Sequence, residues 1–266
     1  MKRRTFLICA AGGLLASPVF ALNEAKPTGE LGVGAAINKA GRQRMLSQRM
    51  AKAYAMQAAG VIPERAGLLL DGSRRLFEAQ LTELKTLAPT EGIQNALLAL
   101  NTAWPRYREV LSRPRSAENA RLVLTESENT LRAAHALTVL YEKHAANSAG
   151  HLVNISGRQR MLSQRIAKCF LFEQSGLDSN GLRAELGTAR REFVAALDEL
   201  NAAPENNAAI RTELELANIQ WLFFEQALNG RESIKEIAAR NVATTSERIL
   251  EIMDSLTGRY ENLVRG

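Results

Sequence analysis

GRQRMLSQR occupies positions 41–49 of the chain and returns unchanged at positions 157–165, an offset of 116 residues. Further pairs follow at slowly growing offsets: Asn38 and Asn154 at 116, Trp104 and Trp221 at 117, and Leu131 and Leu250 with Tyr141 and Tyr260 at 119. Nine identical residues in a row are not a chance match. The chain is therefore an internal duplication with a unit of about 116 residues and small insertions between its elements.

Each copy of the repeat is expected to fold as four helices. Apolar residues recur at helical spacing, Gly and Pro punctuate the chain, and no stretch shows the alternation of a strand. The expected helices span 33–59, 64–88, 91–112 and 117–147 in the first copy, and 151–175, 179–202, 206–228 and 231–264 in the second. Short connections favour antiparallel neighbours, so we predict an all-α fold of two tandem up-down-up-down four-helix bundles, at 33–149 and 150–266.

The joint between the two copies leaves two alternatives open. Residues 145–150 could form a tight turn, or the fourth helix could run straight into the fifth. Asn147, Ser148 and Gly150 favour a break at this point.

The N-terminus is typical of an export signal. Lys2, Arg3 and Arg4 precede an apolar stretch that is too short to span a membrane, and Ala21 ends a suitable cleavage site. We predict a signal peptide at 1–21, used by the Sec route or, because of the paired arginines, by the twin-arginine (Tat) route, followed by a lead-in at 22–32. No later run is long and apolar enough to anchor the chain, so the sequence predicts a periplasmic protein.

Composition excludes several functions. The net charge of +6 includes three basic residues of the signal peptide, so the mature chain would carry only +3, which is too mild to indicate a nucleic-acid partner. Removing Cys9 with the signal peptide leaves Cys169 alone, so no internal disulfide can form. No nucleophile–base pair and no metal-ligand spacing stands out. We therefore expect no enzyme, no catalytic residue, no metal and no cofactor.

The repeated motif has an unusual face when it is placed on a helix. Gly41, Arg44 and Gln48 fall on one side, as do Gly157, Arg160 and Gln164 in the second copy. Glycine inside a helix costs about 1 kcal/mol relative to alanine. Its use twice at the same place indicates close approach by another helix or by a ligand.

Charge around the motif is one-sided. No Asp or Glu lies between Glu30 and Glu64 or between Glu142 and Glu173, and each interval contains three arginines and one lysine of the motif region. A desolvated arginine without a carboxylate favours an external anion, and its planar fork suits a small oxyanion. The predicted ligand-binding residues are Gly41, Arg44, Gln48, Gly157, Arg160 and Gln164, with Asn38, Arg49, Asn154 and Arg165 as second choices. Alternatively, acids on other helices neutralise the arginines, and the motif merely holds one bundle against the next.

These residues resemble a known motif. The segment from Asn38 through Gly41, Arg44 and Met45 to Arg49 resembles the P-box of nitrate/nitrite sensor kinases of the NarX type, and still more the N-terminal domain of PilJ-type methyl-accepting transducers. In the nitrate sensors, two subunits meet at this helix around one nitrate, held by an arginine and a backbone group near the glycine of each. By resemblance, these roles fall on Arg44 and Gly41, and on Arg160 and Gly157. The chain departs from the nitrate-sensor pattern at Arg42, Gln43, Leu46 and Gln48, where it resembles the PilJ-type form.

The resemblance implies a function in sensing. We expect the two copies to pair about a pseudo-twofold axis within a monomer, as sensor subunits do in a dimer, although a dimer of the chain is also open. The leading hypothesis is a periplasmic protein that binds nitrate, nitrite or a similar anion and relays occupancy to a membrane-bound sensor, transducer or transporter. The alternative is a helical protein that binds no ligand and docks onto a chemotaxis or type IV pilus-type transducer or an envelope complex.

Overall fold

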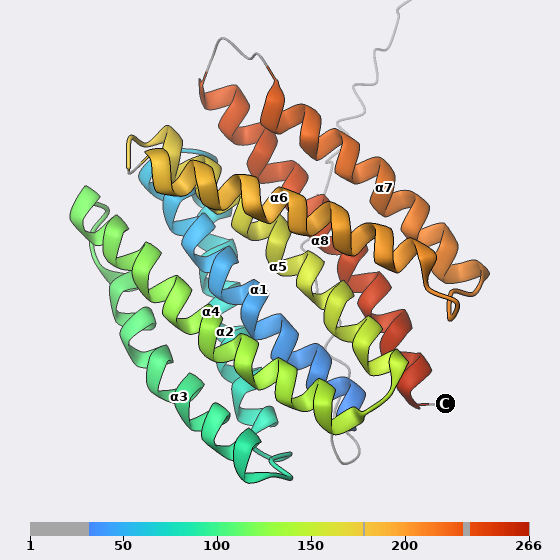
Figure 1. The fold of residues 1–266 in the computed structure, drawn as a ribbon. Helices are drawn as coiled ribbons and strands as arrows, with labels where there is room; N and C mark the ends of the chain where they lie inside the picture. The colour runs from blue at the N-terminus through green and yellow to red at the C-terminus, as the bar shows by residue number, and fades with distance from the viewer. Residues whose placement is uncertain (1–31, 178, 231–234, 266) are drawn as a thin grey trace, which may run out of the picture. The chain divides into compact units, whose positions relative to one another are not determined.

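The computed structural model of the chain describes residues 32–177, 179–230 and 235–265. The predicted signal peptide at 1–21 and all of the predicted lead-in except Gly32 lie outside the described residues. Within the described ranges the secondary structure is helical, without a strand. The helices are α1 (Val33–Ala58), α2 (Pro63–Leu84), α3 (Glu91–Ser112), α4 (Ala117–Ala145), α5 (Ser148–Gln174), α6 (Ser179–Ala202), α7 (Ala208–Asn229) and α8 (Lys235–Arg265) (Figure 1).

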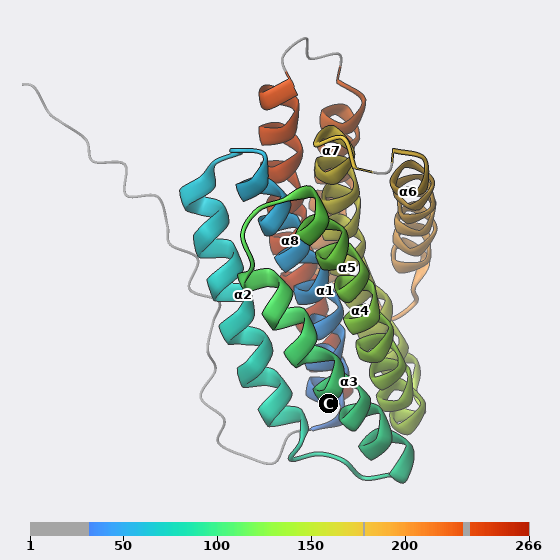
Figure 2. The ribbon, with the colours of Figure 1, turned by 90° about the vertical axis from the view of Figure 1, so that its left-hand side faces the viewer.

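The two copies of the repeat pack in the same way. In the first copy, α1 lies against α2 and α4, and α3 packs on α4 (Figure 2). In the second copy, α5 lies against α6 and α8, and α7 packs on α8. Each motif helix is thus the central helix of its own copy. The predicted all-α fold of tandem helical bundles is confirmed.

An aromatic stack marks the matching core of each copy. Phe77 and Trp104 stack with ring centroids 4.3 Å apart, and Phe193 and Trp221 stack at 4.2 Å. All four rings are buried. Because these pairs join the second and third helices of each copy, they hold the outer helices onto the bundle.

The two motif helices form the junction between the copies. α1 and α5 run side by side in the same direction (Figures 1 and 2), and most residues of both helices are buried. α1 also touches α8, and α5 touches α4, which is the pattern that a pseudo-twofold axis between α1 and α5 produces. The described residues from Gly32 to Arg265 consequently form one compact unit.

The joint between the copies is a turn. α4 ends at Ala145, and Ala146 adopts a left-handed backbone with φ of 51°. Asn147 then caps α5, because its side-chain oxygen accepts a 2.7 Å hydrogen bond from the Gly150 amide. The expected ends at 147 and 151 were therefore a few residues off, since Asn147 belongs to the cap of α5 and not to α4.

Two other helix boundaries also differ from the expected ones. α2 ends at Leu84 rather than 88, because the Leu87 amide folds back onto the Leu84 carbonyl at 3.2 Å and Tyr141 donates a hydrogen bond to the same carbonyl. α7 begins at Ala208 rather than 206, behind the side-chain cap of Asn207. The expected start of the last helix at 231 lies outside the described residues. No described helix has the length and apolar character needed to cross a membrane.

Candidate functional site

The centre of the junction contains two buried arginines, one from each motif helix. Arg44 reaches from α1 to α5, where its Nη2 donates to the Asn154 carbonyl oxygen at 3.1 Å. Arg160 reaches back from α5, and its Nη2 donates to the Asn38 carbonyl oxygen at 3.2 Å. Both side chains are almost fully buried, at 1% and 0% exposure. The two copies are therefore tied together by reciprocal hydrogen bonds.

The glycines of the motif make room for these arginines. A Cβ atom on Gly41 would lie 3.2 Å from Arg44 Nη2 and 3.6 Å from Arg160 Nη2. On Gly157 it would lie 3.1 Å from Arg160 Nη2 and 3.7 Å from Arg44 Nη2. Both guanidinium groups thus lie against both glycines. The paired glycines predict close approach by another helix or a ligand, but the nearest group to each glycine is the guanidinium of its own helix, and the guanidinium of the other helix lies at an ordinary contact distance.

The electrostatic surroundings of the two arginines differ. Burial, followed by the repulsion of Arg160, lowers the pKa of Arg44 to about 9. Burial also lowers the pKa of Arg160, but the attraction of Asp254 limits the fall to about 10. Arg160 Nη1 forms an ion pair with Asp254, whereas Arg44 Nη1 lies 3.4 Å from His135 Nδ1. Among the described residues, Arg44 has no carboxylate partner.

Gln48 and Gln164 lie on the same helices but have a different role. Gln48 Nε2 donates to the Ser127 carbonyl at 3.3 Å, and Gln164 Nε2 donates to the Ser246 carbonyl at 2.9 Å. These bonds fasten each motif helix to the fourth helix of its own copy. The structure therefore brings together Gly41, Arg44, Gly157 and Arg160 with the backbone of Asn38 and Asn154, and it directs the two glutamines elsewhere.

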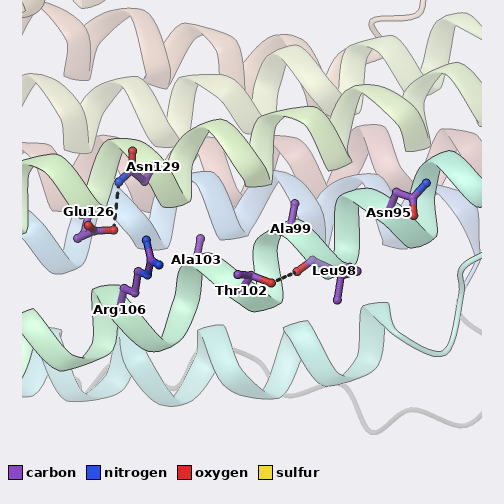
Figure 3. A pocket seen from close by; sticks show the side chains of 8 residues that line it. All are labelled: Asn95, Leu98, Ala99, Thr102, Ala103, Arg106, Glu126 and Asn129. Atoms are coloured by element: carbon purple, nitrogen blue, oxygen red, sulfur yellow. Dashed lines mark hydrogen bonds between the residues drawn. The ribbon is translucent and has the colours of Figure 1, made fainter.

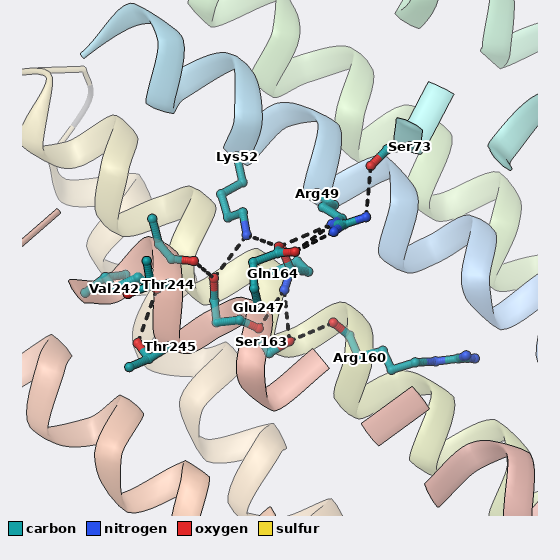
Figure 4. A network of polar contacts seen from close by, with 12 residues as sticks. Arg49, Lys52, Ser73, Arg160, Ser163, Gln164, Val242, Thr244, Thr245 and Glu247 are labelled. Carbon is teal, nitrogen blue, oxygen red and sulfur yellow. Dashed lines mark hydrogen bonds and ion pairs between the residues drawn. The ribbon is translucent and has the colours of Figure 1, made fainter. Parts of the chain in front are cut away.

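Arg49 belongs to a buried ion-pair cluster with an acid from the other copy. Arg49 Nε lies 3.2 Å from both carboxylate oxygens of Glu247 on α8, and Lys52 pairs with the same carboxylate (Figure 4). Lys52 is fully buried, and Glu247 is 5% exposed. Burial would raise the pKa of Glu247, but the two cations outweigh this effect and hold it far below its ordinary value.

The second copy repeats this exchange. Arg165 Nη2 lies 2.9 Å from Glu128 on α4, and Lys168 Nζ lies 2.7 Å from the same carboxylate. Glu185 on α6 joins the cluster at 2.8 Å from Arg165 Nε. Each copy thus supplies one acid, Glu128 or Glu247, to an arginine and a lysine of the other copy.

These ion pairs correct one sequence inference. The absence of nearby acids suggested that the motif arginines need an external anion. Distant acids neutralise most of them: Arg42 and Arg160 share Asp254, Arg158 pairs with Glu192, and Arg49 and Arg165 pair as above. Only Arg44 fits the original argument. Arg49 and Arg165 are therefore parts of the junction between the copies.

The acids were missed because they come from helices far along the chain. Glu128 and Glu247 are nevertheless 119 residues apart, the offset that also relates Tyr141 to Tyr260. His135 and Asp254 occupy another pair of equivalent places, with different residue types. Both pairs could have been found from the sequence by comparing the charged residues of the two copies at the offset of 119.

A surface groove elsewhere does not form part of this centre. It lies between α3 and α4, with Thr102, Arg106, Glu126 and Asn129 in its lining (Figure 3). Asn129 donates to Glu126 at 3.1 Å, and Thr102 donates to a backbone carbonyl of its own helix. None of the lining residues comes from α1 or α5. Within the described residues there is also no group of three side chains suited to hold a metal ion.

Fold and junction together define a duplicated helical domain whose two copies pair inside one chain as the subunits of a dimer would. The chain belongs to the PilJ family, the N-terminal domain of type IV pili methyl-accepting chemotaxis transducers, whose sequence model matches residues 28–135 and 144–249. The predicted PilJ-type resemblance is confirmed, and the resemblance to nitrate sensors stays a prediction. Comparisons with curated proteins and with solved structures give no match.

Proposed function

We propose that this protein works in periplasmic signal transduction as a helical interaction module that docks onto a membrane-bound transducer of the chemotaxis or type IV pilus type. The family match in both copies supports this function. The observation that carries it is that each motif helix is covered by the motif helix of the other copy, so the outer helices remain for a partner.

One outer helix has a surface suited to such a partner. Leu216, Ile219, Leu222 and Phe223 on α7 are 45–67% exposed and follow one another at helical spacing. The equivalent residues of α3, at the offset of 117, are Ala99, Thr102, Pro105 and Arg106. A row of large exposed apolar side chains indicates a contact surface. We assign it to a helix of the transducer's own PilJ-type domain, because the two copies of this chain associate helix against helix through α1 and α5.

A binding measurement tests this docking. The mature protein would be titrated against the purified PilJ-type domain of a transducer from the same bacterium, with biolayer interferometry as the readout. Leu222→Glu with Phe223→Glu should weaken binding by about tenfold or more. Leu98→Glu, at a side chain that is 62% exposed on α3, is the matched control and should not. Absence of binding, or equal losses in both variants, contradicts the proposal.

A second candidate function is supported by Arg44. Within the part of the chain that the structure describes, it is a buried cation without a carboxylate partner, it converges with Arg160, and the Nε atoms of both lack a hydrogen-bond partner. A small oxyanion, with nitrate or nitrite first, would bind at the two arginines, and its occupancy would be relayed to the membrane partner. Titration calorimetry with nitrate, nitrite and acetate tests this function. Binding should disappear in Arg44→Ala and Arg160→Ala and persist in Arg211→Ala, which alters an exposed arginine of α7.

A further inference from the structure

The pseudo-twofold axis relates two places that are occupied differently. On α8, the carboxylate of Asp254 accepts hydrogen bonds from Arg160 Nη1 and, at 2.7 Å, from Arg42 Nη2. The equivalent residue on α4, at the offset of 119, is His135. The second copy therefore shows how a carboxylate is held beside a central arginine, and the first copy has an imidazole at that place.

The cations around His135 match those around Asp254. Arg44 Nη1, the counterpart of Arg160 Nη1, lies 3.4 Å from His135 Nδ1. Arg158 is the counterpart of Arg42, and it is close enough to lower the pKa of both Arg44 and His135. It pairs instead with Glu192, as a partly exposed ion pair at 2.9 Å. The surroundings of His135 thus keep the counterparts of both cations, Arg44 of the first copy and Arg158 of the second, while His135 stands where the second copy has the acid.

We infer that a small oxyanion of single negative charge, such as a carboxylate or nitrate, binds against Arg44 Nη1 and the His135 ring, and neutralises Arg44 as the Asp254 carboxylate neutralises Arg160. This inference deepens the second candidate function, because it moves the anion off the pseudo-twofold axis and makes the site specific to one copy. Asp254 is the internal model for the bound group, so the ligand class follows from a carboxylate that the protein already holds.

The chemistry of the place suits such an ion. Arg44 is buried, so its attraction for an anion is little screened by water. His135 lies exposed on α4, which opens the site to solvent. Burial and the charge of Arg44, followed by that of Arg158, lower the pKa of His135, whereas Glu142 and Glu192 oppose this effect. An anion beside the ring would favour its protonated form, so binding should tighten as the pH falls.

The decisive variant is His135→Asp, which places in the first copy the acid that the second copy has. It should raise the melting temperature without added anion, because Arg44 gains an ion pair. It should also remove the saturable stabilisation that nitrate or acetate produces in the wild-type protein relative to chloride at equal ionic strength. His144→Asp makes the same exchange at an exposed place further along α4 and should change neither property.

A second variant removes the acid from the second copy. Asp254→Ser should open the equivalent place in the second copy, so calorimetry should give two acetate ions per chain instead of one. If the wild-type protein binds nitrate and His135→Asp binds it equally well, the off-axis site is wrong and the shared site of the second candidate function stands. If the wild-type protein responds to none of these anions, both are wrong.

Discussion

Arg44 donates a 3.1 Å hydrogen bond to the backbone of Asn154, the residue that corresponds in the second copy to its own neighbour Asn38. Arg160 returns the bond to Asn38. A reciprocal contact of this kind is what a twofold axis between identical subunits produces. In this chain the relationship is intramolecular, so the contact is repeated between the two copies of one polypeptide.

Replacing a motif glycine should show how closely the central arginines pack against it. In an unobstructed helix, Gly→Ala stabilises by roughly 0.5–1 kcal/mol, and Gly72→Ala on α2 should do so because open space surrounds it. Gly157→Ala should lose this gain, since its Cβ would lie 3.1 Å from Arg160 Nη2. Urea unfolding of both variants measures the difference. Equal gains would mean that the Arg160 guanidinium does not pack against Gly157.

Arg44 and Arg49 should respond in opposite ways to the loss of their charge. Arg44→Met removes a buried cation that has no carboxylate partner, so the free energy of unfolding should stay level or rise. Arg49→Met deprives Glu247 of one of its two cations and should cost about 3 kcal/mol. Guanidinium unfolding provides the comparison. A similar loss in both variants would show that Arg44 is neutralised by a group not identified above.

Glu247 should matter far more than the acid one turn further along α8. Glu247→Gln leaves Arg49 and Lys52 buried without their carboxylate and should cost about 3–5 kcal/mol. Glu251 is exposed, and burial followed by the charge of Glu247 raises its pKa. Glu251→Gln should therefore leave stability unchanged or slightly improved. Thermal unfolding followed by circular dichroism distinguishes these outcomes, and comparable losses would rule out the buried cluster.

Acid should destabilise the junction in a defined range of pH. Burial would raise the pKa of Asp254 and Glu185, but their arginine and lysine partners lower each to about 2, from ordinary values of 3.8 and 4.5. A carboxylate with a lowered pKa stabilises the fold at pH values above its unfolded pKa and loses this contribution as the pH falls through its folded pKa. The melting temperature should therefore fall between about pH 4.5 and pH 2. A flat profile over this range would contradict the ion pairs.

The sequence predicted most of the fold because the repeat and the helix punctuation are local signals. Asn147 and Gly150 indicated a break, and the structure places a side-chain cap there. The predicted helix boundaries were wrong where tertiary contacts decide them. Tyr141, more than fifty residues away, donates a hydrogen bond to the carbonyl at which α2 ends. No pattern within the segment around Leu84 carries that information.

The central site could be predicted only in part for a related reason. Gly41 and Arg44 lie on one helix, so their common face follows from helical geometry alone. Which acid pairs with Arg49 depends on how α8 packs across the junction. The positions of residues around a single helix do not predict this packing. The two glutamines shared the face of Arg44 but bind backbone carbonyls of α4 and α8.

A double-mutant cycle between Lys52 and Glu247 tests whether the motif helices pair the two copies within the chain. Lys52→Glu and Glu247→Lys should each destabilise the protein, and their combination should restore about 1–3 kcal/mol relative to the sum of the two losses. Lys52→Glu combined with Glu251→Lys is the control and should show no such recovery. Strictly additive losses in the first pair would mean that α1 and α8 do not meet across the junction. The motif helices would then not pair the two copies as described.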